Sequence, residues 1–183
     1  MNRDSVNWQG PMPAVTTPFR ADFSLDEEAF RANVDRLFAA GATGMVAGGC
    51  TGEFWALSLD ERAGLARWVA DACKGRGTAI IGTGAIRAEE VIEQTFAARD
   101  AGCDGVLVMP PFFAHLTEAE ILAHYEAIDA ETALPILLYN IPGNAGNALV
   151  PSLVDRLADP DHVVAIKVSS GQWLNFHETL LRV

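Results

Sequence analysis

The sequence predicts an α/β protein of the (β/α)8 TIM-barrel class, and three observations lead to that prediction. Short and nearly unbroken apolar runs alternate with longer amphipathic segments throughout the 183 residues. These runs recur about every 30 residues, so eight units would need about 240 residues, which is the size of a complete barrel. The first run is not followed by the G-x-G-x-x-G motif that marks many nucleotide-binding open sheets. A barrel is therefore favoured over a doubly wound open sheet, the competing architecture.

The six apolar runs are predicted to be β-strands. Most of them are apolar at nearly every position rather than at alternate positions, as expected of strands that are buried on both faces. The helical segments that separate them are joined to them by brief links, which predicts right-handed βαβ units and a parallel sheet. The predicted strands cover residues 13–17, 44–48, 78–83, 105–109, 135–139 and 163–167.

The intervening segments have apolar residues at helical spacing. The first predicted helix covers residues 25–40, with Ser24 as its N-cap. The helix of residues 117–132 begins with a Thr-Glu-Ala-Glu sequence that is typical of a capping box. Further helices are predicted over residues 58–74, 88–101 and 151–157.

The pattern predicts one domain that is shorter than a complete barrel. Residues 1–12 are expected to be an N-terminal lead-in, and residues 13–183 are expected to hold barrel strands one to six. The final residues, 178–183, continue an amphipathic pattern without a helix-stop signal. We therefore expect a barrel that is truncated after about six β/α units.

Composition narrows the classes of partner. The net charge of −11 argues against binding to nucleic acid or to anionic membranes, both of which need clustered positive charge. The sequence contains no run of eighteen apolar residues, so no membrane span is predicted. Three scattered cysteines and the lack of an apolar leader favour a reduced, cytoplasmic protein. The four histidines have no partners at metal-ligand spacing, so we expect no metal site.

Lys167 is the leading candidate for chemistry, because it ends a strand whose preceding four residues are apolar. In a parallel barrel the active site lies at the carboxyl ends of the strands. Burial disfavours the charged form of a lysine, and a neutral amine can attack a ketone or aldehyde to form a Schiff base. The alternative is a lysine that extends to solvent or pairs with a carboxylate.

Two further features are expected near Lys167. Tyr139 ends the preceding strand, and its phenol could transfer protons for a neighbouring amine; alternatively, it is an ordinary aromatic residue at a strand end. The turn of residues 48–53 contains three glycines and Thr51, and such turns can bind a carboxylate through backbone N–H groups. Cys50 offers a thiol, but no histidine lies near it in sequence, so a covalent role is not favoured.

With these residues in place, the sequence resembles the lysine Schiff-base lyases related to dihydrodipicolinate synthase and N-acetylneuraminate lyase. The resemblance runs from about Gly10 to the last residue, and its combination of motifs is far more specific than any single one. The segments that carry it are Ala14-Val15-Thr16-Thr17-Pro18-Phe19, Gly49-Cys50-Thr51-Gly52-Glu53, Tyr139-Asn140-Ile141-Pro142 and Ile166-Lys167-Val168-Ser169-Ser170-Gly171.

The resemblance implies roles for individual residues. Lys167 would bind the C2 carbonyl of pyruvate or another 2-oxo acid, and Tyr139 would relay protons. Thr51, with the turn amides around Cys50 and Gly52, would bind the carboxylate. No cofactor is implied. The resemblance also implies a homotetramer built of two dimers, with residues 110–113 near a subunit contact.

Two departures from the family pattern bear on the substrate. Dihydrodipicolinate synthases usually carry an arginine where this sequence has Asn144, and a second tyrosine in the segment where it has Phe113. The segment Pro142-x-Asn144-x-Gly146 is more similar to the 4-hydroxy-2-oxoglutarate aldolase branch of the family. The expected activity is therefore that of an aldolase or dehydratase on a 2-oxo acid. An authentic dihydrodipicolinate synthase and a pseudoenzyme that only binds a 2-oxo acid remain as alternatives.

Overall fold

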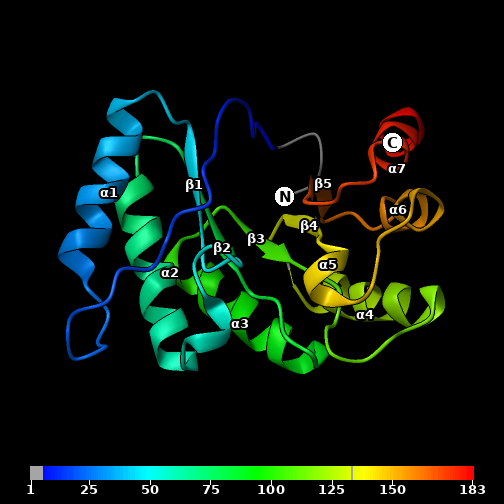
Figure 1. Cartoon of the computed structure of the whole chain (residues 1–183), viewed down its shortest axis with the longest axis horizontal. Coiled ribbons are helices and arrows are strands. Elements are labelled where there is room, and N and C mark those ends of the chain that lie inside the picture. The colour runs from blue at the N-terminus through cyan, green and yellow to red at the C-terminus, as the bar shows by residue number, and fades with distance from the viewer. Residues whose placement is uncertain (1–5, 133) are drawn as a thin grey trace. The chain divides into compact units, whose positions relative to one another are not determined.

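The computed structural model describes residues 6–132 and 134–183, which pack as two compact units (Figure 1). The N-terminal unit comprises residues 7–83 and 94–107. The C-terminal unit comprises residues 84–93 and 108–183, together with Val6. Residues 1–5 of the predicted lead-in lie outside the described residues, and the division between residues 1–12 and 13–183 stays a prediction.

The N-terminal unit is built on parallel strands. β1 (Gly44–Ala47) pairs in register with β2 (Thr78–Gly82), and β2 pairs with β3 (Gly105–Val108), whose last residue belongs to the other unit. Helix α2 (Leu59–Cys73) connects β1 to β2 and contacts both strands. This arrangement confirms the predicted βαβ unit.

The helices of this unit agree closely with the sequence pattern, apart from one cap. Helix α1 (Glu27–Ala39) lies beside α2 (Figure 1), and it is capped by Asp26, whose side chain accepts a hydrogen bond from Ala29 N–H. The prediction of Ser24 as the cap was wrong, because the Ser24 hydroxyl and N–H both donate to Asp22 in the preceding turn. A short 3₁₀ helix, η2, covers Phe54–Ala56, and α3 covers Ala88–Ala101 across both units.

The first predicted strand, residues 13–17, does not form a regular strand. Ala14 makes a single parallel bridge with Val46, supported by hydrogen bonds from Val15 N–H to the Val46 carbonyl and from Val46 N–H to the Pro13 carbonyl. Proline has no N–H to donate, so a segment that contains Pro13 and is followed by Pro18 cannot extend a regular ladder. The segment lies beside β1, as predicted, with fewer bonds than a strand.

The C-terminal unit contains parallel strands β4 (Ile136–Asn140) and β5 (Val163–Val168). Helix α4 (Glu118–Glu131) begins with the predicted capping box between Thr117 and Glu120. Helix α6 (Pro151–Leu157) contacts both α4 and α7 (Trp173–Arg182), as the yellow-green to red end of the chain in Figure 1 shows. Strands β4 and β5, which are consecutive in the sequence, are thus also adjacent in the sheet.

One short helix of this unit was not predicted, whereas the last helix agrees with the amphipathic pattern of residues 178–183. Helix α5 (Pro142–Ala145) has only four residues, too few to show a periodic apolar pattern, and it ends at Gly146 in the left-handed conformation with φ of 75°. Helix α7 includes the amphipathic residues at the end of the sequence. Apolar side chains from strands and helices fill the core of each unit; among the largest fully buried ones are Phe30, Met45, Leu65 and Ile80 in the N-terminal unit and Ile128, Leu138, Leu153 and Leu157 in the C-terminal unit.

Candidate functional site

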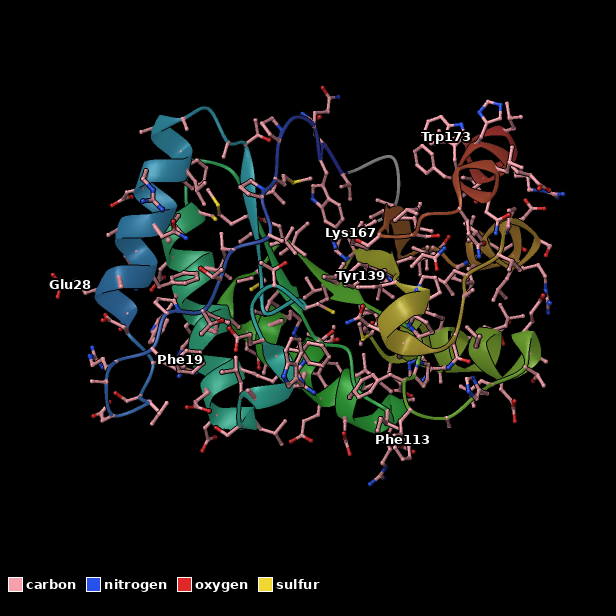
Figure 2. The ribbon with its side chains drawn as sticks, in the orientation of Figure 1. Phe19, Glu28, Phe113, Tyr139, Lys167 and Trp173 are labelled. Carbon is pink, nitrogen blue, oxygen red and sulfur yellow. The ribbon has the colours of Figure 1, made fainter. Side chains whose placement is uncertain are left out.

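Tyr139 and Lys167 are direct neighbours across the β4–β5 ladder. The two residues are Cα partners in the parallel register, each near the carboxyl end of its strand. The Lys167 Nζ atom lies 3.5 Å from the centroid of the Tyr139 ring (Figure 2). The tyrosine is almost completely buried, whereas the lysine is half-buried. The structure thus brings together the two residues for which the sequence predicted chemistry.

The contacts of the Lys167 amine include two that fix its place beside Tyr139. One is the face of the Tyr139 ring, and the other is the Ser169 hydroxyl, which accepts a hydrogen bond from Nζ at 3.2 Å. These contacts place the amine between the ring and the serine hydroxyl. A protonated amine is not a nucleophile, so this site would need an acceptor for the amine's proton before a carbonyl could be attacked.

Asn140, the last residue of β4, fastens the following loop to the strand end. Its side-chain amide donates to the Leu149 carbonyl at 2.8 Å, and its side-chain oxygen accepts from Leu149 N–H at 3.1 Å. Its own backbone carbonyl accepts from Ser169 N–H at 2.8 Å. Asn140 therefore fixes the segment that follows Tyr139 and the segment that follows Lys167.

Asn147 is a second buried amide, and its importance could not be seen in the sequence. Its side-chain nitrogen donates to the carbonyls of Pro111 and Ala114, at 2.6 and 2.8 Å, and its side-chain oxygen accepts from Leu116 N–H at 2.9 Å. These bonds join the loop after β3 to the loop after β4. A buried asparagine with three polar partners is recognisable only once both loops have their final conformation.

The two positions at which the sequence departs from the family pattern are both on the surface. Asn144 is exposed on α5. Phe113 is 94% exposed, has a left-handed φ of 77°, and points away from Tyr139 and Lys167 (Figure 2). A phenylalanine in this conformation is strained, and the Asn147 bonds to the backbone on either side of it hold the loop that imposes it.

The predicted glycine turn belongs to the N-terminal unit and follows β1. Gly48 has a φ of 60°, which favours glycine. A Cβ at Gly82, the last residue of β2, would overlap the Gly48 carbonyl, so the two backbones meet as only glycine allows. The buried Thr17 hydroxyl donates to the Gly52 carbonyl at 2.7 Å. These contacts hold the turn at the carboxyl ends of β1 and β2.

Within the turn, the three predicted binding residues differ in environment. Thr51 is exposed, Cys50 is partly exposed and Gly52 is buried. The Gly52 N–H donates to the Gly49 carbonyl at 3.0 Å, and the Glu53 N–H donates to the Cys50 carbonyl at 3.1 Å. The Gly52 amide is therefore engaged inside the turn.

Other reactive side chains lie in environments that suppress their chemistry. Burial, together with the charge of Asp104, raises the pKa of Cys103 to about 12 and that of Cys73 to about 11. Burial also raises the pKa of Tyr125 well above its ordinary value, and its hydroxyl donates to the Val108 carbonyl at 3.0 Å. These residues fit a structural role.

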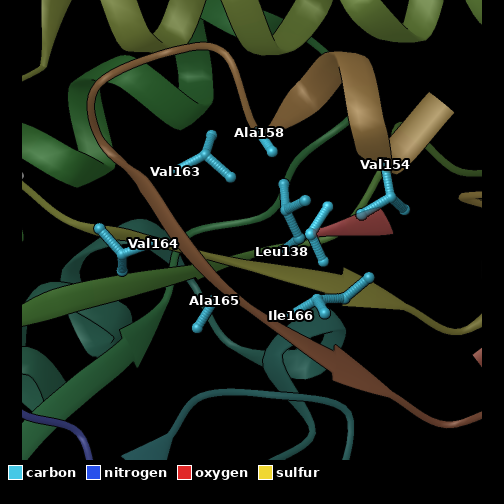
Figure 3. A pocket seen from close by; sticks show the side chains of 8 residues that line it. Leu138, Val154, Ala158, Val163, Val164, Ala165 and Ile166 are labelled. Carbon is cyan, nitrogen blue, oxygen red and sulfur yellow. The ribbon is translucent and has the colours of Figure 1, made fainter. Parts of the chain in front are cut away.

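A cavity of about 230 Å³ in the C-terminal unit is lined by residues with apolar side chains (Figure 3). Its walls come from β4, β5, α6 and the segment after α6, and they include Leu138, Val154 and Ile166. Its lining residues supply no polar side chain to orient a 2-oxo acid. Among residues 6–132 and 134–183, no three His, Cys, Asp or Glu side chains are grouped to hold a metal ion. No helix in the same residues is long and apolar enough to cross a membrane.

Comparisons with known proteins identify the family that this fold belongs to. The family model described as the Dihydrodipicolinate synthetase family matches residues 7–183. The crystal structure of YagE from Escherichia coli K12 in complex with pyruvate superposes with a TM-score of 0.90 at 35% identity, over 94% of this chain and 58% of that one. Dihydrodipicolinate synthase from Aquifex aeolicus superposes with a TM-score of 0.92 at 27% identity, over 96% and 60%. The fold is that of these TIM barrels, as predicted.

Curated relatives carry names from the same family. The chain is 39% identical over 163 residues to a 4-hydroxy-tetrahydrodipicolinate synthase of Saccharophagus degradans, covering 89% of this chain and 56% of the relative. It is 37% identical over 164 residues to the putative 2-dehydro-3-deoxy-D-gluconate aldolase YagE of Escherichia coli, covering 89% and 54%. The chain thus spans slightly more than half the length of these relatives.

Proposed function

The chain belongs to the dihydrodipicolinate synthetase family. We propose that it acts as a cofactor-independent lyase, in which Lys167 forms a Schiff base with pyruvate or another 2-oxo acid. The observation that carries the proposal is the pairing of Tyr139 with Lys167, with the amine 3.5 Å from the ring centroid. A nucleophile beside a group that can exchange protons is the arrangement that imine chemistry requires. The reported complex of YagE with pyruvate supports the choice of substrate class.

The proposed reaction begins when the Lys167 ammonium gives up a proton. The neutral amine attacks the C2 carbonyl carbon, the carbonyl oxygen takes up a proton, and a carbinolamine forms. Loss of water then gives the protonated imine, which draws electrons away from the neighbouring carbon. We assign the proton transfers to the Tyr139 hydroxyl, since its ring already contacts the amine. Carbon–carbon cleavage, carbon–carbon formation or dehydration next to C2 can follow from this intermediate.

We assign binding of the substrate carboxylate to the glycine turn. The Gly52 amide is engaged by Gly49, which supports Cys50 and Thr51 as the residues whose N–H groups, with the Thr51 hydroxyl, would receive the anion. Gly52 would contribute by shaping the turn: a Cβ there would lie 2.9 Å from the Gly48 nitrogen.

We propose that the molecule that reacts with the 2-oxo acid is not aspartate semialdehyde. Asn144 is exposed on α5 and has a neutral amide in place of the arginine that would pair with a second carboxylate. An aldolase or dehydratase related to 4-hydroxy-2-oxoglutarate aldolase is therefore preferred. The runner-up is authentic 4-hydroxy-tetrahydrodipicolinate synthase, because the relative from Saccharophagus degradans carries that name.

We also propose that the whole protein is a cytoplasmic tetramer made of two dimers. Support comes from the family resemblance, from the exposure of Phe113 and from its strained backbone, which a subunit contact would offset. Sedimentation velocity checks this proposal, and a monomer at micromolar concentration would contradict it.

Borohydride trapping tests the proposed chemistry directly. The chain contains only two lysines, Lys74 and Lys167, so the labelled residue can be assigned without ambiguity. With pyruvate present, hydride should reduce the imine and leave a carboxyethyl group on Lys167. Peptide mass spectrometry should find this group on the peptide with Lys167, while Lys74, at the end of α2, provides an internal control.

Two variants complete this test. Lys167→Arg keeps the charge but has no nucleophilic amine, so its adduct should disappear, whereas Lys74→Arg should label like the unmodified chain. Circular dichroism establishes that each protein is folded. A folded chain whose Lys167 gains no carboxyethyl group at saturating pyruvate would refute the proposal.

A further inference from the structure

Ser169 is the residue whose hydroxyl contacts the reacting atom of the proposed site. Its Oγ atom accepts a hydrogen bond from Lys167 Nζ at 3.2 Å. Ser169 lies one residue beyond the end of β5 and two residues after Lys167. Because side chains alternate along an extended chain, residues two apart point to the same side. The hydroxyl is therefore well placed to meet the lysine amine.

The backbone of Ser169 is fixed even though it lies outside the strand. Asn140 and Val168 are partners in the β4–β5 register, and the bond from Ser169 N–H to the Asn140 carbonyl, at 2.8 Å, adds one more rung to that ladder. The Asn140 side chain is itself fastened to Leu149 by two hydrogen bonds. The Ser169 hydroxyl therefore projects from an anchored backbone.

We propose that Ser169 is a positioning residue for Lys167. Its hydroxyl holds the Nζ atom over the face of the Tyr139 ring, so that the amine meets the substrate carbonyl in one orientation. The catalytic part of this inference rests on the proposed Schiff-base function; the positioning itself does not. A lysine side chain loses considerable rotamer entropy when it is ordered, and ordering it before the substrate arrives removes that cost from the reaction.

The neighbouring Ser170 is a natural control. Its Oγ atom accepts from the Gln172 N–H at 3.1 Å, so this hydroxyl is used within the loop before α7. Ser170→Ala removes a hydroxyl of the same size from the next residue and leaves the hydrogen bond between Ser169 and Lys167 in place. The pair of serines therefore separates the hydrogen bond to the amine from a general effect on the loop.

Nuclear magnetic resonance measures the position of the amine without any reaction. With labelled lysine, the chain gives side-chain signals from Lys74 and Lys167 only, and Lys74→Arg assigns them. The Hε protons of Lys167 should be shifted upfield by the ring current of Tyr139, and Tyr139→Leu should abolish that shift. We expect Ser169→Ala to reduce the shift by at least half, and Ser169→Thr and Ser170→Ala to retain it. An unchanged shift in Ser169→Ala would overturn the proposal.

The rate of borohydride trapping provides the second readout. Loss of one hydrogen bond to the amine should slow trapping by pyruvate about fivefold in Ser169→Ala, with recovery in Ser169→Thr and no change in Ser170→Ala. A trapping rate in Ser169→Ala equal to that of the unmodified chain would also overturn the proposal. If the unmodified chain forms no adduct at all, the proposed function fails, and the ring-current shift still decides whether Ser169 positions Lys167.

Discussion

The Lys167 amine lies against the face of the Tyr139 ring, with 3.5 Å between Nζ and the ring centroid. The ring and the hydroxyl of this tyrosine can therefore have separate roles. The ring face can attract a cationic amine, and the hydroxyl can exchange protons. Both contributions depend on the parallel register that makes the two residues Cα partners.

Tyr139→Phe should separate these contributions. The variant keeps the ring, so Lys167 should retain its upfield-shifted Hε signals, but it lacks the proposed proton relay. We expect borohydride trapping by pyruvate to be slowed about a hundredfold, at the lower end of the range for acid–base catalysis. Quenched-flow trapping followed by mass spectrometry measures this rate. If the phenylalanine variant reacts as fast as the unmodified chain, the hydroxyl is not the relay.

His124 should make the fold sensitive to acid. Burial lowers the pKa of His124 to about 4, opposed in part by the charge of Glu89, and Nε2 has no hydrogen-bond partner among the described residues. The unfolded histidine takes up a proton near pH 6.5, whereas the folded one does so only near pH 4. The folded state therefore has its full stability above pH 6.5 and loses stability as the pH falls from 6.5 to 4. The loss should reach about 3 kcal/mol.

Urea unfolding between pH 4 and 7 measures that dependence, and His124→Phe provides the comparison. Phenylalanine keeps a ring for the edge-to-face contact with Tyr125, whose centroid lies 5.5 Å away. The unfolding free energy of the variant should depend less steeply on pH, with a slope smaller by the uptake of up to one proton. Equal slopes in the two proteins would show that His124 does not titrate in this range.

The three cysteines should react very unevenly. Burial raises the pKa of Cys73 and of Cys103, and both are almost inaccessible, whereas Cys50 is partly exposed in the glycine turn. Iodoacetamide at pH 8 should therefore modify Cys50 in the folded chain and all three thiols in urea. Peptide mass spectrometry assigns the sites. Rapid modification of Cys103 under native conditions would contradict its buried position.

Asn147→Ala should be strongly destabilising. It removes three hydrogen bonds and leaves the Pro111 and Ala114 carbonyls and the Leu116 N–H without this partner, at a cost of about 3 kcal/mol. Equilibrium unfolding in urea measures the change. Asn33→Ala, on the surface of α1, is the control and should alter stability little. A similar effect of both substitutions would mean that the bonds of Asn147 matter less than their burial suggests.

Asn144→Arg tests the assignment of the substrate's far end. If the lost arginine explains a changed substrate preference, the variant should gain condensation activity with aspartate semialdehyde relative to the unmodified chain, while trapping with pyruvate stays the same. A coupled assay of pyruvate consumption follows the reaction. Strong condensation activity already present with Asn144 would instead promote the runner-up, 4-hydroxy-tetrahydrodipicolinate synthase.

Local sequence patterns were sufficient to predict much of the fold. The apolar runs that end at Tyr139 and at Lys167 are parallel strands as predicted, and consecutive parallel strands place their carboxyl ends together. β4 is buried along its whole length, whereas only Val163 of β5 is fully buried. The capping box at Thr117 marked the start of α4 in the same direct way. These features depend on residues close in sequence, which is why they could be predicted.

Features that depend on the folded loops could not be found in this way. Pro13 reduces the first predicted strand to a single bridge, because the missing N–H breaks the ladder that its apolar neighbours suggest. The bonds of Asn147 join residues more than thirty positions away, and the hydrogen bond between Ser169 and Lys167 depends on the rung that Asn140 supplies. A single sequence carries no local signal for such partners.

Because Asn140 grips Leu149 at both its N–H and its carbonyl, the peptide between them is a loop closed by one side chain. Gly143 and Asn144, two of its exposed positions, can then be replaced while the frame beside Tyr139 stays in place. Substitutions at those two positions can therefore test which acceptors the proposed Schiff base takes while the amine itself is unaltered.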